Sequence, residues 1–217
     1  MIIILKDKAD LAVQKLKQEY PDAICSLQYT DPLQLLVATR LAAQCTDARV
    51  NIVTPNLFAK FRTAQDFANA AVSEVEQYIK TCGLYKTKAK DLVAMGKMLC
   101  DRFDGKVPDN IDDLISLPGI GRKTANLVLG DIYNQPAVVV DTHFIRITSR
   151  LGFHNIKDAK KIEFLMRDLL DPTESNDFCH RIVLHGRAVC VARNPQCQKC
   201  CLQTICDYYQ NEFNQAE

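Results

Sequence analysis

Helical hydrophobic periodicity runs along almost the whole chain, and it constrains the possible folds more than any other feature. Apolar residues recur at three- and four-residue spacing, which is the pattern of helices that bury one face. The segments that follow it are residues 33–45, 73–82, 87–103, 110–116, 156–170 and 176–191. Only the run AVVV at 137–140 has the character of a strand, and it is too short to require a sheet. The sequence therefore predicts an all-α fold.

Composition and charge limit the kinds of protein that this chain can be. Its 217 residues are 47% hydrophobic and 24% charged, which allows one globular domain or two small ones. The net charge is +1, so nucleic-acid binding would have to come from a local basic patch. No apolar run approaches the roughly 18 residues of a membrane span, and the start of the chain does not resemble a signal peptide. We expect a monomeric, cytoplasmic protein that does not bind membranes.

The stretch LPGIGRKTANLVLG at 117–130 places a glycine turn directly before a helical pattern. Gly119 and Gly121 tolerate positive φ, and the next helix is expected to begin near Arg122. Such a turn aims unpaired N–H groups outward at the positive end of a helix, which suits one phosphate. An ordinary helix–helix turn explains this stretch equally well by itself. The P-loop and the dinucleotide fingerprint do not match, because both need a preceding strand and a different placement of glycines.

Lys123 lies one step past this turn, where its amine has a chemical use. A lysine is a nucleophile only when it is neutral. A helix N-terminus, the neighbouring Arg122 and partial burial would each disfavour the ammonium form. A neutral amine in this place can attack an electrophilic carbon and form a Schiff base. The other interpretation is a solvated surface charge.

Asp141 opens a second candidate stretch, VVVDTHFIRITSRLG. It stands between a β-branched run and a helical pattern, so we expect it to cap the helix that follows. A carboxylate held rigidly as a cap can also serve nearby chemistry, and the two roles do not exclude each other. His143 and Arg146 follow within about one helical turn. A histidine by itself is more often structural than catalytic.

Four of the ten cysteines follow the spacing Cys190-x6-Cys197-x2-Cys200-x5-Cys206. In a reducing compartment the scattered cysteines are most simply buried hydrophobes, whereas four thiolates in one short segment can hold a metal centre. Zinc binds four cysteines, but zinc ribbons usually bring two Cys-x-x-Cys knuckles, and here there is one. A [4Fe–4S] cluster fits slightly better, and the spacing alone leaves both open. Cys201 could replace Cys200 as a ligand, although we expect it to be a bystander.

Taken together, these motifs resemble the endonuclease III family of helix-hairpin-helix DNA glycosylases. The glycine turn, the Asp141 stretch and the cysteine spacing occur in the order typical of that family. The similarity extends over nearly the whole chain through LLVATRLAAQCTD, YIKTCGLYKTKAKDL and VLHGRAVCVARNPQC. One of these motifs could mislead, but all of them in this order are highly specific.

The resemblance implies two helical domains and a set of site residues. Residues 25–135 would form a six-helix bundle with the helix-hairpin-helix, and residues 1–24 and 136–217 a domain carrying a [4Fe–4S] loop. Lys123 would be the nucleophile and Asp141 the catalytic carboxylate. The cluster ligands would be Cys190, Cys197, Cys200 and Cys206. The DNA contacts would include Gln44, Leu84, Gly119, Gly121, Arg122, His143, Arg187 and Arg193.

The resemblance also implies a reaction and a place for it. The chain would be a bifunctional DNA glycosylase and AP lyase of base excision repair, acting on oxidised or ring-damaged pyrimidines in double-stranded DNA. Gln44 and Leu84 would fill the gap left by a flipped nucleotide, and β-elimination would cleave the strand. Such an enzyme would be associated with the nucleoid. The candidates for a basic DNA-facing patch are Lys86, Lys88, Arg122, Arg146 and Arg187.

Two other functions are compatible with the same sequence. One is a glycosylase of this architecture with another lesion preference, such as mismatched thymine, pyrimidine dimers or 8-oxoguanine. The other is a non-catalytic DNA-binding module that uses the hairpin to grip phosphate. Such a module would need neither Lys123 nor Asp141. Trapping with borohydride separates the two, because only a Schiff-base former becomes covalently attached to damaged DNA under reduction.

Overall fold

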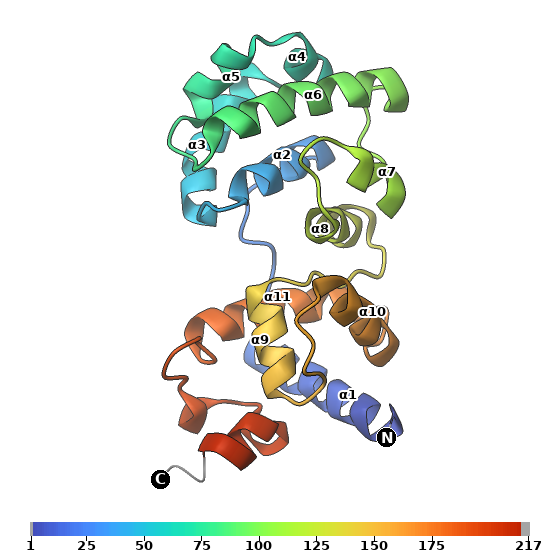
Figure 1. Ribbon diagram of the computed structural model, residues 1–217, viewed down its shortest axis with the longest axis vertical. Coiled ribbons are helices and arrows are strands. Elements are labelled where there is room, and N and C mark those ends of the chain that lie inside the picture. The colour runs from blue at the N-terminus through green and yellow to red at the C-terminus, as the bar shows by residue number, and fades with distance from the viewer. Residues whose placement is uncertain (1, 214–217) are drawn as a thin grey trace. The chain divides into compact units, whose positions relative to one another are not determined.

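The chain is helical and divides into two compact units. The computed structural model describes residues 2–213, and within that range it contains no strand (Figure 1). One unit comprises residues 25–134, and the other joins residues 1–24 to residues 135–217. The run at 137–140 is buried, irregular backbone and not a strand. Among the described helices, none has the length and apolar character needed to cross a membrane. The prediction of an all-α fold is confirmed.

Polar caps fix where the helices of the 25–134 unit begin. The Asp31 carboxylate accepts a hydrogen bond of 2.9 Å from the Gln34 N–H. Thr63 and Asp66 form a capping box, in which each side chain accepts from the other residue's backbone. These caps satisfy N–H groups that a helix start otherwise leaves unpaired. The helices are α2 (Pro32–Ala42), α3 (Asp47–Lys60), α4 (Ala64–Asn69), α5 (Val72–Ile79), α6 (Tyr85–Phe103), α7 (Ile111–Ser116) and α8 (Arg122–Tyr133).

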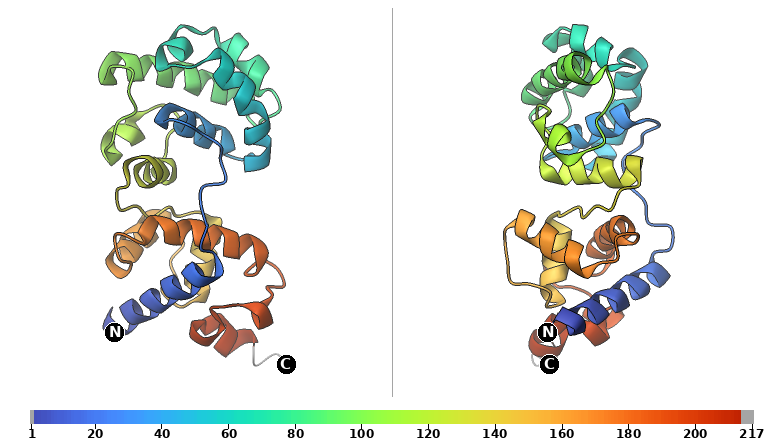
Figure 2. Two further views of the ribbon diagram at one scale, coloured as in Figure 1. Left: turned by 180° about the vertical axis from the view of Figure 1, so that it is seen from behind. Right: turned by 90° about the vertical axis from the view of Figure 1, so that its right-hand side faces the viewer.

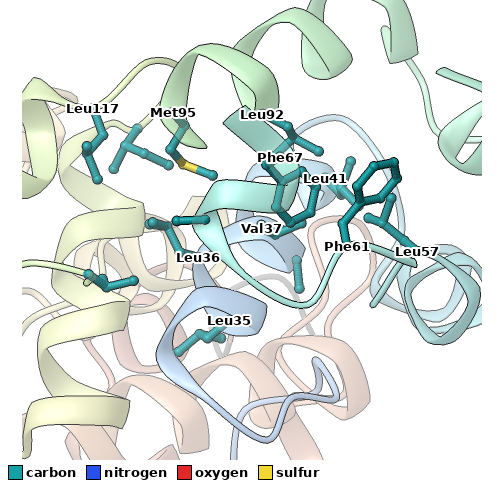
Figure 3. Packing of buried hydrophobic residues seen from close by; sticks show 14 of the residues in the cluster. Leu35, Leu36, Val37, Leu41, Leu57, Phe61, Phe67, Leu92, Met95 and Leu117 are labelled. Atoms are coloured by element: carbon teal, nitrogen blue, oxygen red, sulfur yellow. The ribbon is translucent and has the colours of Figure 1, made fainter. Parts of the chain in front are cut away.

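The core of this unit gathers apolar side chains from most of its helices (Figure 3). Leu35, Leu36 and Leu41 of α2 are fully buried in it. Phe67 of α4 stacks on Phe61 with ring centroids 5.1 Å apart. Burying each such side chain contributes about 1.5–3 kcal/mol. The resulting rigid frame supports the turns before α3, α6 and α8, which carry the candidate site.

The other unit is built from both ends of the chain. Its first helix lies alongside its last long helix, as two views of the ribbon show (Figure 2). The Tyr20 hydroxyl is 3.1 Å from Nδ1 of His185, and Lys17 pairs with Glu174 over 2.5 Å. These contacts join residues 165 and 157 positions apart in the sequence. The elements are α1 (Ile2–Glu19), α9 (Thr142–Arg150), α10 (Ala159–Leu169), α11 (Ser175–Ala188), and the short helices η1 (Cys197–Lys199), η2 (Gln203–Ile205) and η3 (Tyr209–Phe213).

The predicted helix bounds differ from the observed ones by a few residues, and local caps explain the differences. Helix α10 begins after Asp158, whose carboxylate accepts from the Lys161 N–H over 2.9 Å, three residues later than predicted. Helix α6 begins at Tyr85, two residues earlier than predicted, directly after Leu84 in a left-handed conformation. Hydrophobic periodicity locates the apolar face of a helix, but the capping residue decides where the helix begins.

Candidate active site

The glycine turn at 117–121 joins α7 to α8 and is anchored by two apolar side chains. Leu117 and Ile120 are buried, and the Ile120 N–H donates to the Leu117 carbonyl over 3.1 Å. Gly119 has a φ of +76°, in the left-handed region that glycine enters without a steric cost. Gly121 is the N-cap of α8 and has no side chain to accept from the first N–H groups of the helix. The helix start can therefore offer these donors to an anion such as a phosphate.

An ion pair beneath the turn gives a second reason for glycine at position 119. Arg40 of α2 donates to Asp91 of α6, with Nε 2.9 Å from Oδ2. A Cβ atom on residue 119 would lie 2.8 Å from both the Arg40 Cδ and the Asp91 Oδ2. The two side chains are only 12% and 23% exposed, so neither can move aside freely. Sequence reasoning missed this pair, because nothing near residue 119 in the sequence signals two residues on other helices.

Lys123 is the second residue of α8, and its side chain is exposed, so the partial burial expected from the sequence is wrong. An amine on the first turn of this helix is accessible to a molecule whose phosphate is bound by the hairpin turn. Asp141, its predicted partner in catalysis, belongs to the other compact unit. The pairing of the two groups therefore stays a prediction.

Gln44 and Leu84 both have a left-handed backbone conformation, and they lie on two neighbouring turns. Gln44, between α2 and α3, has a φ of +54°, and Leu84, before α6, has a φ of +59°. Both side chains are exposed, Leu84 to 56%. A Cβ on Gly83 would lie 3.0 Å from the Gln44 carbonyl oxygen, so the two turns touch. Positive φ in residues other than glycine is uncommon and clusters at functional sites.

Asp141 caps α9, as the sequence predicts. Its Oδ1 accepts a hydrogen bond of 2.7 Å from the Phe144 N–H, and the residue is half-buried. This bond holds the carboxylate in one orientation at the helix start. His143 follows in the first turn of α9. Burial lowers the pKa of its imidazole, while the charge of Asp141 opposes that effect.

The candidates for a basic patch divide into exposed and anchored side chains. Lys88 is wrong as a DNA-facing residue, because it is fully buried and donates to the Leu41 carbonyl over 2.7 Å. Arg146 binds the Cys190 and Gly186 carbonyls over 2.8 and 3.1 Å, which ties α9 to the end of α11. The other patch candidates are exposed or half-buried: Lys86, Arg122 and Arg187. Arg193, a predicted DNA contact in the cysteine loop, is also exposed.

Four cysteines line one hollow in the C-terminal loop: Cys190, Cys197, Cys200 and Cys206. Burial is the main cause that raises the pKa of Cys200, to about 12, and it also raises those of Cys197 and Cys206. Among the described residues, no three Cys, His, Asp or Glu side chains could hold a single metal ion. Cys201 lies instead near Glu19 and Lys15 of α1.

Arg150 organises this hollow, and sequence reasoning missed it. Its guanidinium donates to the Cys190 sulfur over 3.2 Å and to the Val191 carbonyl over 2.9 Å. It also lies over the Tyr208 ring, 4.7 Å from the centroid. A positive charge beside a thiolate stabilises the thiolate form, which is the form that binds metal. Arginine is a common surface residue, so its place in the sequence gave no signal of this role.

Comparison with known proteins covers most of the chain. A family model of the HhH-GPD superfamily of base excision DNA repair proteins matches residues 37–172. Endonuclease III of Synechocystis sp. is 43% identical over 202 residues, which span 93% of this chain and 92% of that protein. The chain belongs to the endonuclease III family. The family predicted from the sequence motifs is confirmed.

Solved structures of endonuclease III have the same fold as this chain. One is a non-covalent complex of endonuclease III with DNA, and another is a trapped covalent intermediate with DNA, an estranged-adenine complex. Each has a TM-score of 0.90 and 38% identity, and covers 96% of this chain and 98% of its own. Endonuclease III family members are DNA glycosylases and AP lyases of base excision repair, so the predicted class of enzyme is confirmed as well.

Proposed function

We propose that this endonuclease III family enzyme removes oxidised or ring-damaged pyrimidines from double-stranded DNA, and then cleaves the strand through a Schiff base on Lys123. The observation that carries the proposal is an exposed lysine on the first turn of α8, directly after the hairpin turn. A glycosylase that activates water needs no amine there and stops at the abasic site. The trapped covalent intermediate of a relative with the same fold supports a covalent route.

The hairpin turn binds the DNA backbone without reading its sequence. The N–H groups at the start of α8 donate to one phosphate, and the helix dipole favours its charge. Arg40 and Asp91, packed against Gly119, keep the turn in this shape before DNA arrives. Exposed basic residues such as Arg122, Arg187 and Arg193 add to the attraction. Binding should therefore weaken as the salt concentration rises.

Gln44 and Leu84 hold the duplex open around the extruded nucleotide. A damaged base inside a duplex is out of reach, and flipping it out costs a few kcal/mol in lost stacking and pairing. Leu84 supplies an apolar wedge and Gln44 a side-chain amide that can hydrogen-bond to the unpaired base. Their exposure and their positive φ, on turns that touch, support this role. The cost of opening is lower for a damaged base, which contributes to selectivity.

Lys123 and Asp141 carry out the first bond exchange. In its unprotonated form, the Lys123 nitrogen forms a bond to the anomeric carbon, C1′, while the bond from C1′ to the base breaks. The base leaves with the bonding electron pair and takes up a proton, and the lysine nitrogen loses one. The Asp141 carboxylate stabilises the positive charge that develops on the sugar and helps to move these protons. The cap bond from Phe144 keeps that carboxylate oriented.

The lysine adduct then makes strand cleavage possible. The bond from C1′ to the ring oxygen O4′ breaks, O4′ takes up a proton, and a protonated imine forms between Lys123 and C1′. The imine acidifies C2′, which loses a proton, and the bond from C3′ to the phosphate oxygen breaks. This β-elimination cuts the strand on the 3′ side of the lesion. Water finally hydrolyses the imine and releases the enzyme.

The cysteine hollow fits a [4Fe–4S] cluster better than a zinc ion. A zinc ion needs its sulfur ligands about 2.3 Å from one centre, whereas a four-iron cluster places each thiolate on a different iron. The four thiols share one hollow, and their spacing, with a single Cys-x-x-Cys pair flanked by wider gaps in a member of this family, favours the cluster. Cys190, Cys197, Cys200 and Cys206 would hold the cluster. Bound there, it supplies a rigid cross-link of the loop, and base removal needs no net electron transfer from it.

Borohydride trapping tests the proposed function. Reduction of the imine should join the wild-type enzyme to a duplex that contains one oxidised pyrimidine. Lys123→Gln should form no adduct and still bind the lesion duplex. Lys97→Gln is the matched control, because it removes an exposed lysine from α6 that has no proposed part in catalysis. It should trap like the wild type.

Separate scoring of base release and strand cleavage completes the test. Duplexes with one oxidised pyrimidine should yield both the released base and the cleaved strand. Duplexes with mismatched thymine or a pyrimidine dimer should yield less of each product. Trapping that survives Lys123→Gln would remove that residue as the nucleophile. The lack of any adduct with folded, cluster-loaded wild type would favour the non-catalytic DNA-binding module.

A further inference from the structure

Two thiols lie where the Gln44 and Leu84 turns touch. Cys45 directly follows Gln44, and Cys82 precedes Gly83 and Leu84. The close approach of Gly83 to the Gln44 carbonyl brings these segments together from separate helices. The two thiols are near enough for Cys45 to act on the pKa of Cys82. Neither cysteine belongs to the set that lines the C-terminal hollow.

A buried lysine holds the two turns in place from beneath. Lys88 lies on the first turn of α6, and its ammonium donates to the Leu41 carbonyl near the end of α2. A cation at that end of a helix interacts favourably with the helix dipole. The charge of Lys88 also acts on both thiols. Lys88 therefore ties the end of α2 to the start of α6, and the Cys45 and Cys82 segments lie beside this link.

The two thiols differ in access to solvent. Cys45 is half-buried, while Cys82 is 1% exposed. Burial, followed by the neighbouring Cys45, raises the pKa of Cys82 to about 11. A small oxidant from solution therefore meets Cys45 first. Cys82 is then the thiol that can react with an oxidised Cys45.

We propose that Cys45 and Cys82 form a reversible disulfide in the presence of a hydroperoxide, and that this cross-link lowers the affinity of the enzyme for lesion DNA. The effect on DNA rests on the proposed function, in which Gln44 and Leu84 hold the opened duplex. A disulfide requires a sulfur–sulfur distance of about 2.05 Å, shorter than any hydrogen-bonded contact of two thiols. Because Gly83 and the Gln44 carbonyl are already in contact, we expect that drawing the two sulfurs together shifts the turns that carry Gln44 and Leu84.

The chemistry balances with one peroxide molecule. The Cys45 sulfur attacks one peroxide oxygen, the O–O bond breaks, and the products are a sulfenic acid and water. The Cys82 sulfur then attacks the Cys45 sulfur, and the sulfenic hydroxyl leaves with the Cys82 proton as a second water. The two sulfurs lose two electrons together, and the peroxide is reduced to two waters. A dithiol reductant reverses the oxidation by thiol–disulfide exchange.

The test compares cluster-loaded enzyme before and after treatment with dilute hydrogen peroxide. Mass spectrometry of non-reduced digests should find a peptide that links Cys45 to Cys82. Affinity for a lesion duplex should fall by about tenfold, or about 1.4 kcal/mol, and should return with dithiothreitol. Cys45→Ser and Cys82→Ala keep the four cluster cysteines. Peroxide should leave the affinity of both variants unchanged.

Controls separate this proposal from damage to the cluster and from the proposed function. Absence of the linked peptide in the wild type, or a linked peptide with unchanged affinity, overturns the disulfide switch. An equal loss of affinity in both variants also overturns it, because the loss then comes from another group. Reduced wild type must form the borohydride adduct in the same assay. If it does not, the proposed function fails, whatever the thiols do.

Discussion

The two units of this chain hold their candidate functional groups by different means. In the 25–134 unit, Gln44, Leu84 and Gly119 all have positive φ on short turns between packed helices. In the other unit, the cysteine loop is held by long-range polar contacts, of which Arg150 to Cys190 and Val191 are the clearest. The first arrangement is set by local backbone geometry over a hydrophobic core. The second depends on distant segments and on whatever the thiols bind.

This difference predicts different responses to mutation. A change in the 25–134 unit should alter DNA binding while its fold persists, because the core supports the turns independently. A change at the thiols should loosen the unit that contains them. Asp141 is a special case, since one side chain there is both a helix cap and the proposed catalytic group.

The largest expected effect separates these two roles of Asp141. Asparagine caps a helix as well as aspartate does, so Asp141→Asn should keep the Phe144 bond and change stability little. It removes the charge that stabilises the sugar cation, so base release should slow by about 10²–10⁴-fold. Single-turnover kinetics and urea unfolding measure the two quantities.

Asp158→Asn is the matched control for that variant. Asp158 caps α10 in the same unit and has no proposed part in catalysis. Its substitution should change neither the rate nor the stability. A wild-type rate in Asp141→Asn would show that the carboxylate acts only as a cap.

The next effect concerns the cysteine hollow. Cys200→Ala should abolish the absorbance of the cluster, since Cys200 is one of its four proposed ligands. Amide protection in α1 and α11 should then fall by at least about a hundredfold, or about 2.7 kcal/mol, because metal binding is coupled to folding. Protection in α2 and α6 should stay unchanged. Hydrogen exchange with mass spectrometry reads both units in one experiment.

Cys201→Ala is the control for the cysteine hollow. Cys201 lies next to Cys200 in sequence but near Glu19 in the structure. Cys201→Ala should keep both the absorbance of the cluster and the amide protection of α1 and α11. If Cys200→Ala keeps the cluster absorbance and still binds DNA, our account of this loop is wrong. If Cys200→Ala lowers amide protection equally in both units, the contrast between the units is removed.

A smaller effect tests the preformed hairpin. Gly119→Ala combines a left-handed φ with a clash against Arg40 and Asp91. Gly105→Ala has a similar φ, +73° against +76°, but its Cβ would enter open space. Both should lose about 1 kcal/mol of stability from backbone strain. Only Gly119→Ala should also lose affinity for DNA, by about tenfold, in a fluorescence-anisotropy titration. Equal affinities would show that the ion pair does not shape the turn.

The smallest effect is a pH dependence from Lys88. Burial lowers the pKa of this lysine in the folded protein. Just below the ordinary lysine pKa of about 10.4, the unfolded chain therefore binds more protons than the folded one. Stability should rise with pH in that range, and by no more than about 1.4 kcal/mol per pH unit from this group.

Lys88→Met should remove this rise, as measured by urea unfolding at several alkaline pH values. Lys97→Met, an exposed lysine on the same helix, serves as the reference. If both variants keep the same slope as the wild type, Lys88 does not titrate on unfolding in this range. The buried amine would then stabilise the Gln44 turn without any pH dependence.

The elements that sequence predicted well are those with a local physical signal. Periodicity located α2, α5, α6, α7, α10 and α11 but did not single out α1, α3 or α4, and the caps at Asp31 and Asp141 follow from residue type and position. The glycine turn before α8 was predicted because proline restricts φ and glycine permits positive φ within a few residues. The strand-like run at 137–140 shows the limit of such signals: β-branched residues are also favourable in buried irregular backbone when no partner strand is near.

The sequence by itself determined the all-helical fold, the family, and the residue types available for chemistry, because spacing and composition act along the chain. Only the tertiary structure decided which side chains meet. It buried Lys88 under the Gln44 turn, set Arg40 and Asp91 beneath Gly119, and brought Cys45 beside Cys82. Each of these contacts joins segments that are distant in sequence. Packing in three dimensions selects them, and no local pattern of residues encodes that selection.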